Sequence, residues 1–194
     1  MLFILDNGHG NNTPGKRSPV WSDGSQLFEW DFNRKVVRGI KARLDLLGIS
    51  SVILVPEDRD ISISERVKRA NNIYKDNKDC LLISIHGNAG RGTGWEAWTS
   101  IGRTKSDYYV KFFYDSAKQY LKGWLLRGDT RDGDMDWEGN FDILTKTKCP
   151  AIVTENLFMD TEKDCKFMMS PEGLDAIVAL HVDAIITIND EQEK

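Results

Sequence analysis

The feature that most constrains the fold is an alternation of short apolar runs with longer amphipathic segments. The runs are Leu2–Leu5, Ser51–Val55, Leu81–Ile85, Trp95–Thr99 and Ala151–Thr154. Their lengths suit strands buried on both faces, as in a mostly parallel sheet covered by helices. The segments between them carry apolar residues at helical spacing. The sequence therefore predicts an α/β layered fold.

Helices are expected where these amphipathic patterns meet start and stop signals. The first two expected helices cover residues 25–47 and a segment that begins at 62 and continues past 74. The other two cover residues 106–122 and a segment from 170 toward the end of the chain. Ser62 and Glu65 form a capping-box pattern at the second helix, and Gly48 is a stop signal after the first. The segment Gly128–Asn140 is rich in acids and glycine and predicts an exposed loop.

Composition narrows the class of protein. The net charge is −4 with no basic stripe, which argues against a nucleic-acid binder. No apolar run approaches the ~20 residues of a membrane span. The three cysteines share no short spacing, so neither a disulfide framework nor a CxxC metal site is predicted. We expect one domain over residues 1–189 and a polar tail over 190–194.

Two of the three histidines occupy matching positions. His9 follows the first apolar run, and His86 ends the third, each beside a glycine. Ligands of parallel α/β sheets bind beyond the carboxyl ends of the strands, so the two imidazoles are expected to converge. The third, His181, shares an apolar stripe of the last helix and is expected to pack. Taken singly, His9 or His86 is better explained as a loop histidine hydrogen-bonded to backbone, and only the matching pair favours a site.

Two glutamates complete this candidate site. Glu29 lies among Leu27, Phe28 and Trp30 and would be the third ligand of a zinc ion held by two histidines and one carboxylate. Glu155 ends a buried-looking strand, where it would act as the base beside a metal-activated water. Alone, Glu29 is also explained as a helix N-terminal acid, and Glu155 as an acid that caps a turn.

Together these residues resemble a known family. The motifs, in chain order, are Asp6–Gly10, Glu29, Asp60–Arg66 with Ala70-Asn71, Ser84–Ala89 and Pro150–Glu155. They are similar to the zinc-dependent N-acetylmuramoyl-L-alanine amidases of the amidase_3 type, which cleave peptidoglycan. The resemblance spans Leu2 to about Leu180. Each motif is weak alone, but five in order are specific.

The resemblance implies a three-layer α/β/α sandwich around a mostly parallel, mixed sheet. It implies zinc bound by His9, Glu29 and His86, with Glu155 as the catalytic acid and base. The substrate would be peptidoglycan or a muropeptide, cut between N-acetylmuramic acid and L-alanine. Asn88 and Arg127 are candidate substrate-binding residues, the latter as a partner for a carboxylate.

Some residues depart from the family pattern. The family usually has Gly-Phe at the second and third positions after the catalytic glutamate, whereas Leu157 precedes Phe158 here. Glu96 matches a Gly-x-Glu strand of the family but is not a ligand there, so we expect it outside the site. The segments 11–24 and 128–140 match no motif, and substrate preference is expected there.

Two alternatives remain from the sequence. The same metal set serves a zinc carboxypeptidase or a deacetylase acting on another amide, and an inactive domain could bind the cell wall. No secretion signal is recognisable at the N-terminus. We therefore expect a protein made in the cytoplasm that acts on the bacterial wall, as a phage-type lysin or an enzyme released by a partner.

Overall fold

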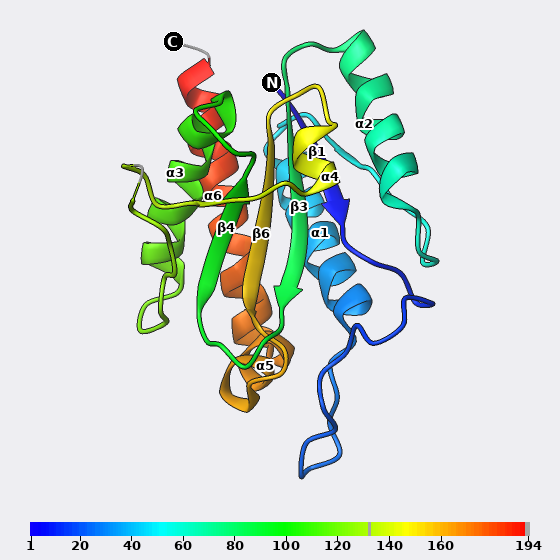
Figure 1. The fold of residues 1–194 in the computed structure, drawn as a ribbon, viewed down its shortest axis with the longest axis vertical. Helices are drawn as coiled ribbons and strands as arrows, with labels where there is room; N and C mark the ends of the chain where they lie inside the picture. The colour runs from blue at the N-terminus through cyan, green and yellow to red at the C-terminus, as the bar shows by residue number, and fades with distance from the viewer. Residues whose placement is uncertain (132, 193–194) are drawn as a thin grey trace.

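One mixed sheet with helices on both faces forms the computed structural model, which describes residues 1–131 and 133–192 (Figure 1). The strands are β1 Leu2–Asn7, β2 Ser51–Ile53, β3 Cys80–Asn88, β4 Trp95–Thr99, β5 Trp137–Glu138 and β6 Ala151–Phe158. Their order is β2-β1-β3-β6-β4-β5, and β4 is antiparallel to β6 while the other neighbours are parallel. The prediction of an α/β/α sandwich around a mostly parallel, mixed sheet is confirmed.

Helices of different lengths cover the two faces of the sheet. They are α1 Glu29–Leu46, α2 Ile63–Asp76, α3 Lys105–Tyr120, α4 Asp142–Thr145, α5 Glu162–Met169 and α6 Pro171–Gln192. None of the helices in the described part of the chain is long and apolar enough to cross a membrane.

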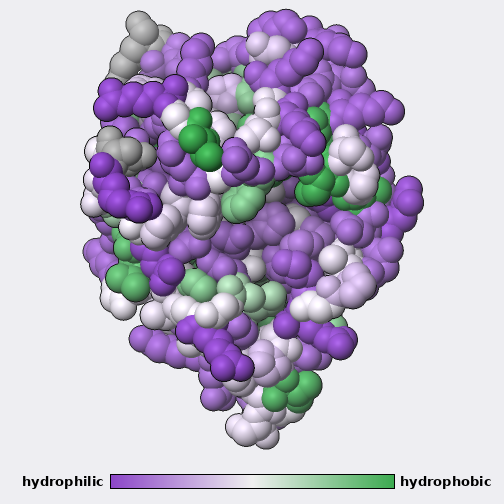
Figure 2. Space-filling view, in the orientation of Figure 1, coloured by the Kyte–Doolittle hydropathy of each residue, from purple (hydrophilic) through white to green (hydrophobic). Residues whose placement is uncertain are grey.

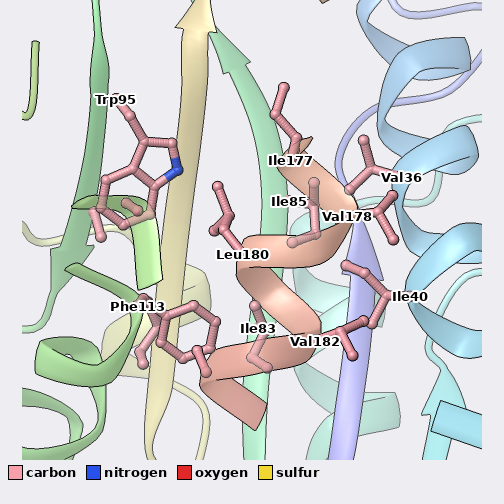
Figure 3. Close-up of a cluster of buried hydrophobic side chains, with 14 of the residues drawn as sticks. Val36, Ile40, Ile83, Ile85, Trp95, Phe113, Ile177, Val178, Leu180 and Val182 are labelled. Carbon is pink, nitrogen blue, oxygen red and sulfur yellow. The ribbon is translucent and has the colours of Figure 1, made fainter. Parts of the chain in front are cut away.

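Alternate strand residues supply two separate cores, because successive side chains of a strand point to opposite faces. On β3, Ile83 and Ile85 join the core under α1, α3 and α6, whereas Leu82 joins the core under α2 and α4. Figure 3 shows α6 side chains reaching both α1 and the sheet, among them Val178 and Leu180. The larger core therefore anchors α6 against the centre of the sheet.

The face under α2 and α4 stays partly open toward the carboxyl ends of the strands, because α4 is only four residues long. After Leu82, the next β3 residues on this face are polar, Ser84 and His86, and Glu155 follows Val153 on β6. Figure 2 shows this side of the molecule as largely hydrophilic, with scattered hydrophobic patches. On this face, the strand residues are therefore apolar under the helices and polar beyond them.

The first helix begins at Glu29, four residues later than the sequence predicted. Segment 25–28 instead pairs with 17–18: the amide of Ser18 donates to the Leu27 carbonyl, and an antiparallel bridge joins Arg17 to Phe28. This pairing supplies hydrogen bonds to the backbone of residues 27–28 without a helix. The helical spacing of apolar residues gives no sign of such a pairing.

Segment 128–140 is not simply an exposed loop, which corrects the prediction. Trp137 belongs to β5 and stacks on Trp98, with ring centroids 5.7 Å apart. Asp136 is buried and accepts a hydrogen bond from the Thr99 hydroxyl at 2.6 Å. Non-local contacts with β4 therefore fix a segment whose composition is typical of a loop.

The last helix also extends further than expected. It includes residues 190–192 of the expected polar tail, and residues 193 and 194 lie outside the described residues. Helices α4 and α5 were not anticipated, because four and eight residues are too few for a clear periodic signal.

His181 lies on α6 and its side chain is completely buried, as its position on an apolar stripe predicted. Its Nδ1 lies 2.7 Å from the Ile177 carbonyl oxygen, which can only accept, so Nδ1 carries the proton. The hydroxyl of Thr154 therefore donates to Nε2 over 2.9 Å. Burial lowers the pKa of His181 to about 4, which keeps the ring neutral.

We expect His181 to make the free energy of unfolding depend on pH. Its pKa is 6.5 in the unfolded chain and about 4 in the folded one, so the unfolded state binds more protons between these values. Stability is complete above this window and falls by about 3 kcal/mol as the pH drops through it. Chemical denaturation at several pH values should show the stability difference between wild type and His181→Gln shrinking toward pH 4. A difference that stays constant would contradict the assignment.

Candidate active site

Three side chains from distant segments meet at the carboxyl edge of the sheet. His9 follows β1, Glu29 opens α1 and His86 lies near the end of β3. One ligand atom from each lies within 4.8 Å of the others. Glu29 Oε1 is 3.3 Å from His9 Nε2 and 3.1 Å from His86 Nδ1. The structure thus brings together the trio that the sequence predicted.

The loop after β1 is shaped to hold His9 against His86. A side chain at Gly8 would collide with the His86 ring, since its Cβ would lie 2.1 Å from Cε1. His9 itself has a φ of 62°, a left-handed conformation that non-glycine residues rarely adopt. Its carbonyl oxygen accepts hydrogen bonds from Arg34 at 3.0 Å and Arg66 at 3.2 Å. Two buried arginines therefore fix this unusual turn.

Arg66 also ties the turn to the sheet. Its Nη1 donates to Asp6 Oδ1 at 2.5 Å, and both side chains are almost completely buried. The other Asp6 oxygen accepts from the Ser84 hydroxyl at 2.6 Å, which links β1 to β3 two residues before His86. A buried ion pair costs desolvation, but one with all its hydrogen bonds made fixes a local geometry. Here that geometry is the approach of β1 and β3 behind the two histidines.

Glu29 is 1% exposed and ionised. Burial raises its pKa, but hydrogen bonds with His86 and His9 outweigh burial and hold the pKa well below its usual range. Its Oε2 has no hydrogen-bond partner among the residues that the structure describes. A buried carboxylate with two imidazole neighbours and one oxygen that accepts no hydrogen bond from the described residues suits a metal ion, because two nitrogens and one oxygen are a common zinc ligand set.

Lys16 is a nearby cation that sequence analysis missed. Its ammonium lies 3.8 Å from Glu29 Oε2, and its carbonyl oxygen accepts from the Glu29 amide. The pairing of 17–18 with 27–28 places it there. No motif in segment 11–24 signals this position, because it depends on that local pairing.

Glu155 stands beside the trio without belonging to it. It occupies the position on β6 opposite His86 on β3. Its Oε2 is buried and unpartnered within the described residues. Burial raises the pKa of Glu155 to about 7; His86 lowers it, and Glu29 and Glu96 raise it further. The surroundings of the two carboxylates thus shift their pKa values in opposite directions, down for Glu29 and up for Glu155.

Glu96 lies nearer to this site than the sequence indicated. It sits on β4 directly opposite Glu155 and is only 5% exposed. Its carboxylate accepts hydrogen bonds from Asn88 Nδ2 at 2.8 Å, Trp98 Nε1 at 3.1 Å and Arg127 Nε at 2.6 Å. Both candidate substrate-binding residues, Asn88 and Arg127, are thus joined through it. The register of β4 on β6 is the signal that places Glu96 here.

Leu157, which stands where the family usually has glycine, has a backbone conformation typical of glycine. Its φ is 66°, in the left-handed region that favours glycine, and the pairing of β3 with β6 shifts register between His86 and Asn88. Leu157 is fully buried in the larger core, so its side chain gains burial where glycine would avoid strain.

The space beside the trio is a shallow groove. The cavity there measures about 120 Å³ and is lined by Asp6, Gly8, His9, Asp60, Ile61, Ser62, Ile63, Arg66 and His86. A larger cavity of about 550 Å³ lies around Cys80 and Cys149, at the opposite ends of the strands. No cluster of metal ligands lines the larger cavity within the described part of the chain. The groove, rather than the larger cavity, is therefore lined by two members of the trio, His9 and His86.

The arrangement suits metal-assisted hydrolysis, and known proteins resemble the chain along its length. A family model described as N-acetylmuramoyl-L-alanine amidase matches residues 3–187. A sporulation-specific N-acetylmuramoyl-L-alanine amidase of Bacillus subtilis (strain 168) is 24% identical over 189 residues, which cover 95% of this chain and 67% of that protein. An endolysin of Bacillus phage SPP1 is 27% identical over 199 residues, covering 100% of this chain and 68% of that protein.

Solved structures show the same architecture. The crystal structure of an N-acetylmuramoyl-L-alanine amidase from Clostridium difficile 630 matches with a TM-score of 0.84 and 26% identity. The match covers 97% of this chain and 96% of that chain.

Proposed function

The chain belongs to the N-acetylmuramoyl-L-alanine amidase family, and we propose that His9, Glu29 and His86 hold its catalytic metal ion with Glu155 as acid and base. The reaction is hydrolysis of the amide between N-acetylmuramic acid and L-alanine in peptidoglycan. The observation that carries the residue roles is the convergence of the trio within 4.8 Å, beside an unpartnered carboxylate.

Zinc is the ion that we propose for this trio. Two imidazole nitrogens and one carboxylate oxygen match the ligands of hydrolytic zinc sites, whereas magnesium prefers oxygen alone. The ionised state of buried Glu29 supports this fit, as does its Oε2, which accepts no hydrogen bond from the described residues. Bound zinc supplies a Lewis acid that polarises the scissile carbonyl and lowers the pKa of water.

Glu155 moves the proton in this proposal. It accepts a proton from the attacking water and donates the same proton to the nitrogen of L-alanine as the C–N bond breaks. Its position opposite His86 places it beside the ligands without using its carboxylate for binding. A pKa of about 7 supports both roles, because a group that titrates near neutral pH can accept and return a proton.

Digestion of purified peptidoglycan tests this function. With zinc present, we expect new amino termini on L-alanine, intact stem peptides and a glycan that keeps its N-acetyl groups. Mass spectrometry of the products measures all three. Release of single amino acids from the end of the stem would indicate a carboxypeptidase, and release of acetate a deacetylase. Binding to the wall without new amino termini would indicate an inactive domain.

A further inference from the structure

Four ionisable side chains form a row across the sheet. His86 on β3 lies opposite Glu155 on β6, and Glu155 lies opposite Glu96 on β4. Directly opposed residues point to the same face, and their neighbouring strands lie ~4.8 Å apart. Arg127 contacts Glu96 and ends the row. The row therefore begins at the proposed metal ligands and leads away from them over β6 and β4.

Backbone contacts fix Arg127 beside the start of β4, on the side away from β6. The amide of Trp95 donates to the Leu125 carbonyl, and the amide of Arg127 donates to the Trp95 carbonyl. Gly94 permits this approach, because a Cβ there would lie 2.2 Å from the Leu125 carbonyl oxygen. The segment 125–127 therefore runs parallel to β4 in a fixed register, which places Arg127 beside Glu96.

The guanidinium of Arg127 is held along one side only. Nε donates to Glu96 Oε2 at 2.6 Å, and the group lies over the Phe158 ring, 5.1 Å from its centre. Glu96 Oε1 is occupied by Asn88 and Trp98, so the carboxylate itself is fixed. The Nη atoms of Arg127 make no hydrogen bond to the described residues, and the side chain is 35% exposed. Its two Nη groups thus remain available for bidentate binding of a carboxylate.

We infer that Arg127 binds a carboxylate of the departing stem peptide, on the residue that follows L-alanine. This inference rests on the proposed function, because it uses Glu155 as the group that protonates the leaving nitrogen. The peptide then begins beside Glu155 and extends away from the metal ligands, toward Glu96 and Arg127. Arg127 stands two positions along the row from Glu155, or ~10 Å between Cβ atoms at ~5 Å per position, and L-alanine with the next residue spans ~7 Å when extended. The long Arg127 side chain covers the remaining distance to a carboxylate on that next residue.

Glu96 acts as a positioning residue for Arg127. Its buried carboxylate neutralises one edge of the guanidinium and aims the other edge outward. Asn88 serves the same end indirectly, through its hydrogen bond to Glu96. Arg127 alone thus contacts the substrate carboxylate, and Glu96 and Asn88 hold Arg127 in position.

Two muropeptides that differ at one group test the inference. In both, the stem ends at the residue after L-alanine; in one, that residue carries a free α-carboxylate, and in the other it carries the carboxamide. We expect wild type to cleave the acid with a kcat/KM about tenfold to hundredfold higher. Arg127→Met should abolish this preference by slowing cleavage of the acid alone. Arg127→Lys should keep part of it, because the charge remains but the two-pronged geometry is lost.

Glu96→Gln should lower the same preference without removing cleavage of the amide. Because the readout is a ratio between two substrates, changes in the acidity of Glu155 cancel. Arg103→Met is the matched control, since Arg103 is exposed in the segment before α3 and its loss removes the same charge. It should leave the preference unchanged.

Binding of the released peptides gives a second readout that does not depend on turnover. By calorimetry, wild type should bind the acid peptide more tightly than the amide, and Arg127→Met should bind both alike. If wild type cleaves both muropeptides equally, or if Arg127→Met slows both by the same factor, the inference is wrong and the proposed function stands. If wild type cleaves neither, the proposed function itself fails.

Discussion

Glu155→Gln should retain about one zinc ion per chain and lose hydrolysis of peptidoglycan by about 10²- to 10⁴-fold. Glutamine has nearly the same shape, but it cannot accept the proton of water or return it to the leaving nitrogen. Metal binding should be kept because Glu155 stands opposite His86 without being one of the three proposed ligands. Metal analysis of the purified variant and the release of L-alanine amino termini measure the two effects separately.

The matched control for this variant is Glu138→Gln. Glu138 lies on β5, is exposed and accepts a hydrogen bond from the Gly102 amide, at the far end of β4 from the site. We expect this variant to retain full activity. Full activity in Glu155→Gln would refute the role of Glu155, and loss of zinc from it would move Glu155 into the ligand set.

His86→Ala should release the metal. The substitution removes one of the three proposed ligand atoms and leaves Glu29 and His9 as the remaining two. Loss of a group that merely orients a ligand weakens metal binding about 10- to 100-fold, so loss of a ligand itself should exceed this. We expect substoichiometric zinc after purification and no measurable amidase activity.

His181→Gln separates ligand loss from the general effect of removing a histidine. His181 is buried and hydrogen-bonded, but its partners are Thr154 and Ile177 rather than the trio. Zinc content should therefore be normal in His181→Gln and low in His86→Ala, with circular dichroism showing both folded. Undiminished zinc in His86→Ala would overturn the ligand assignment.

Local sequence was enough to place the trio because each member sits at the end of a well-marked element. His9 and His86 follow apolar runs that form β1 and β3, and Glu29 lies in an apolar context at the start of α1. The parallel arrangement of β1 and β3 then brings the two histidines to one edge. The apolar periodicity, together with the rule that ligands bind at the carboxyl ends of parallel strands, therefore predicts this part of the site.

What the sequence could not predict depends on pairing between distant segments. Glu96 joins the site through the register of β4 on β6, and Lys16 through the pairing of 17–18 with 27–28. Asp136 and Trp137 lie in a stretch of loop-like composition, but contacts with β4 fix them. Composition and periodicity report local preference, whereas these positions are set by long-range hydrogen bonds.

The order of the strands has a consequence for synthesis. The strand that carries Glu155, β6, is the last in the chain but lies between β3 and β4 at the middle of the sheet. A nascent chain on the ribosome leaves that gap open until residues 151–158 have emerged, and non-local pairing of this kind forms late. Until then the chain lacks Glu155, the proposed acid and base, beside its histidines. The sheet centre and the proposed catalytic site are therefore completed by the same late strand.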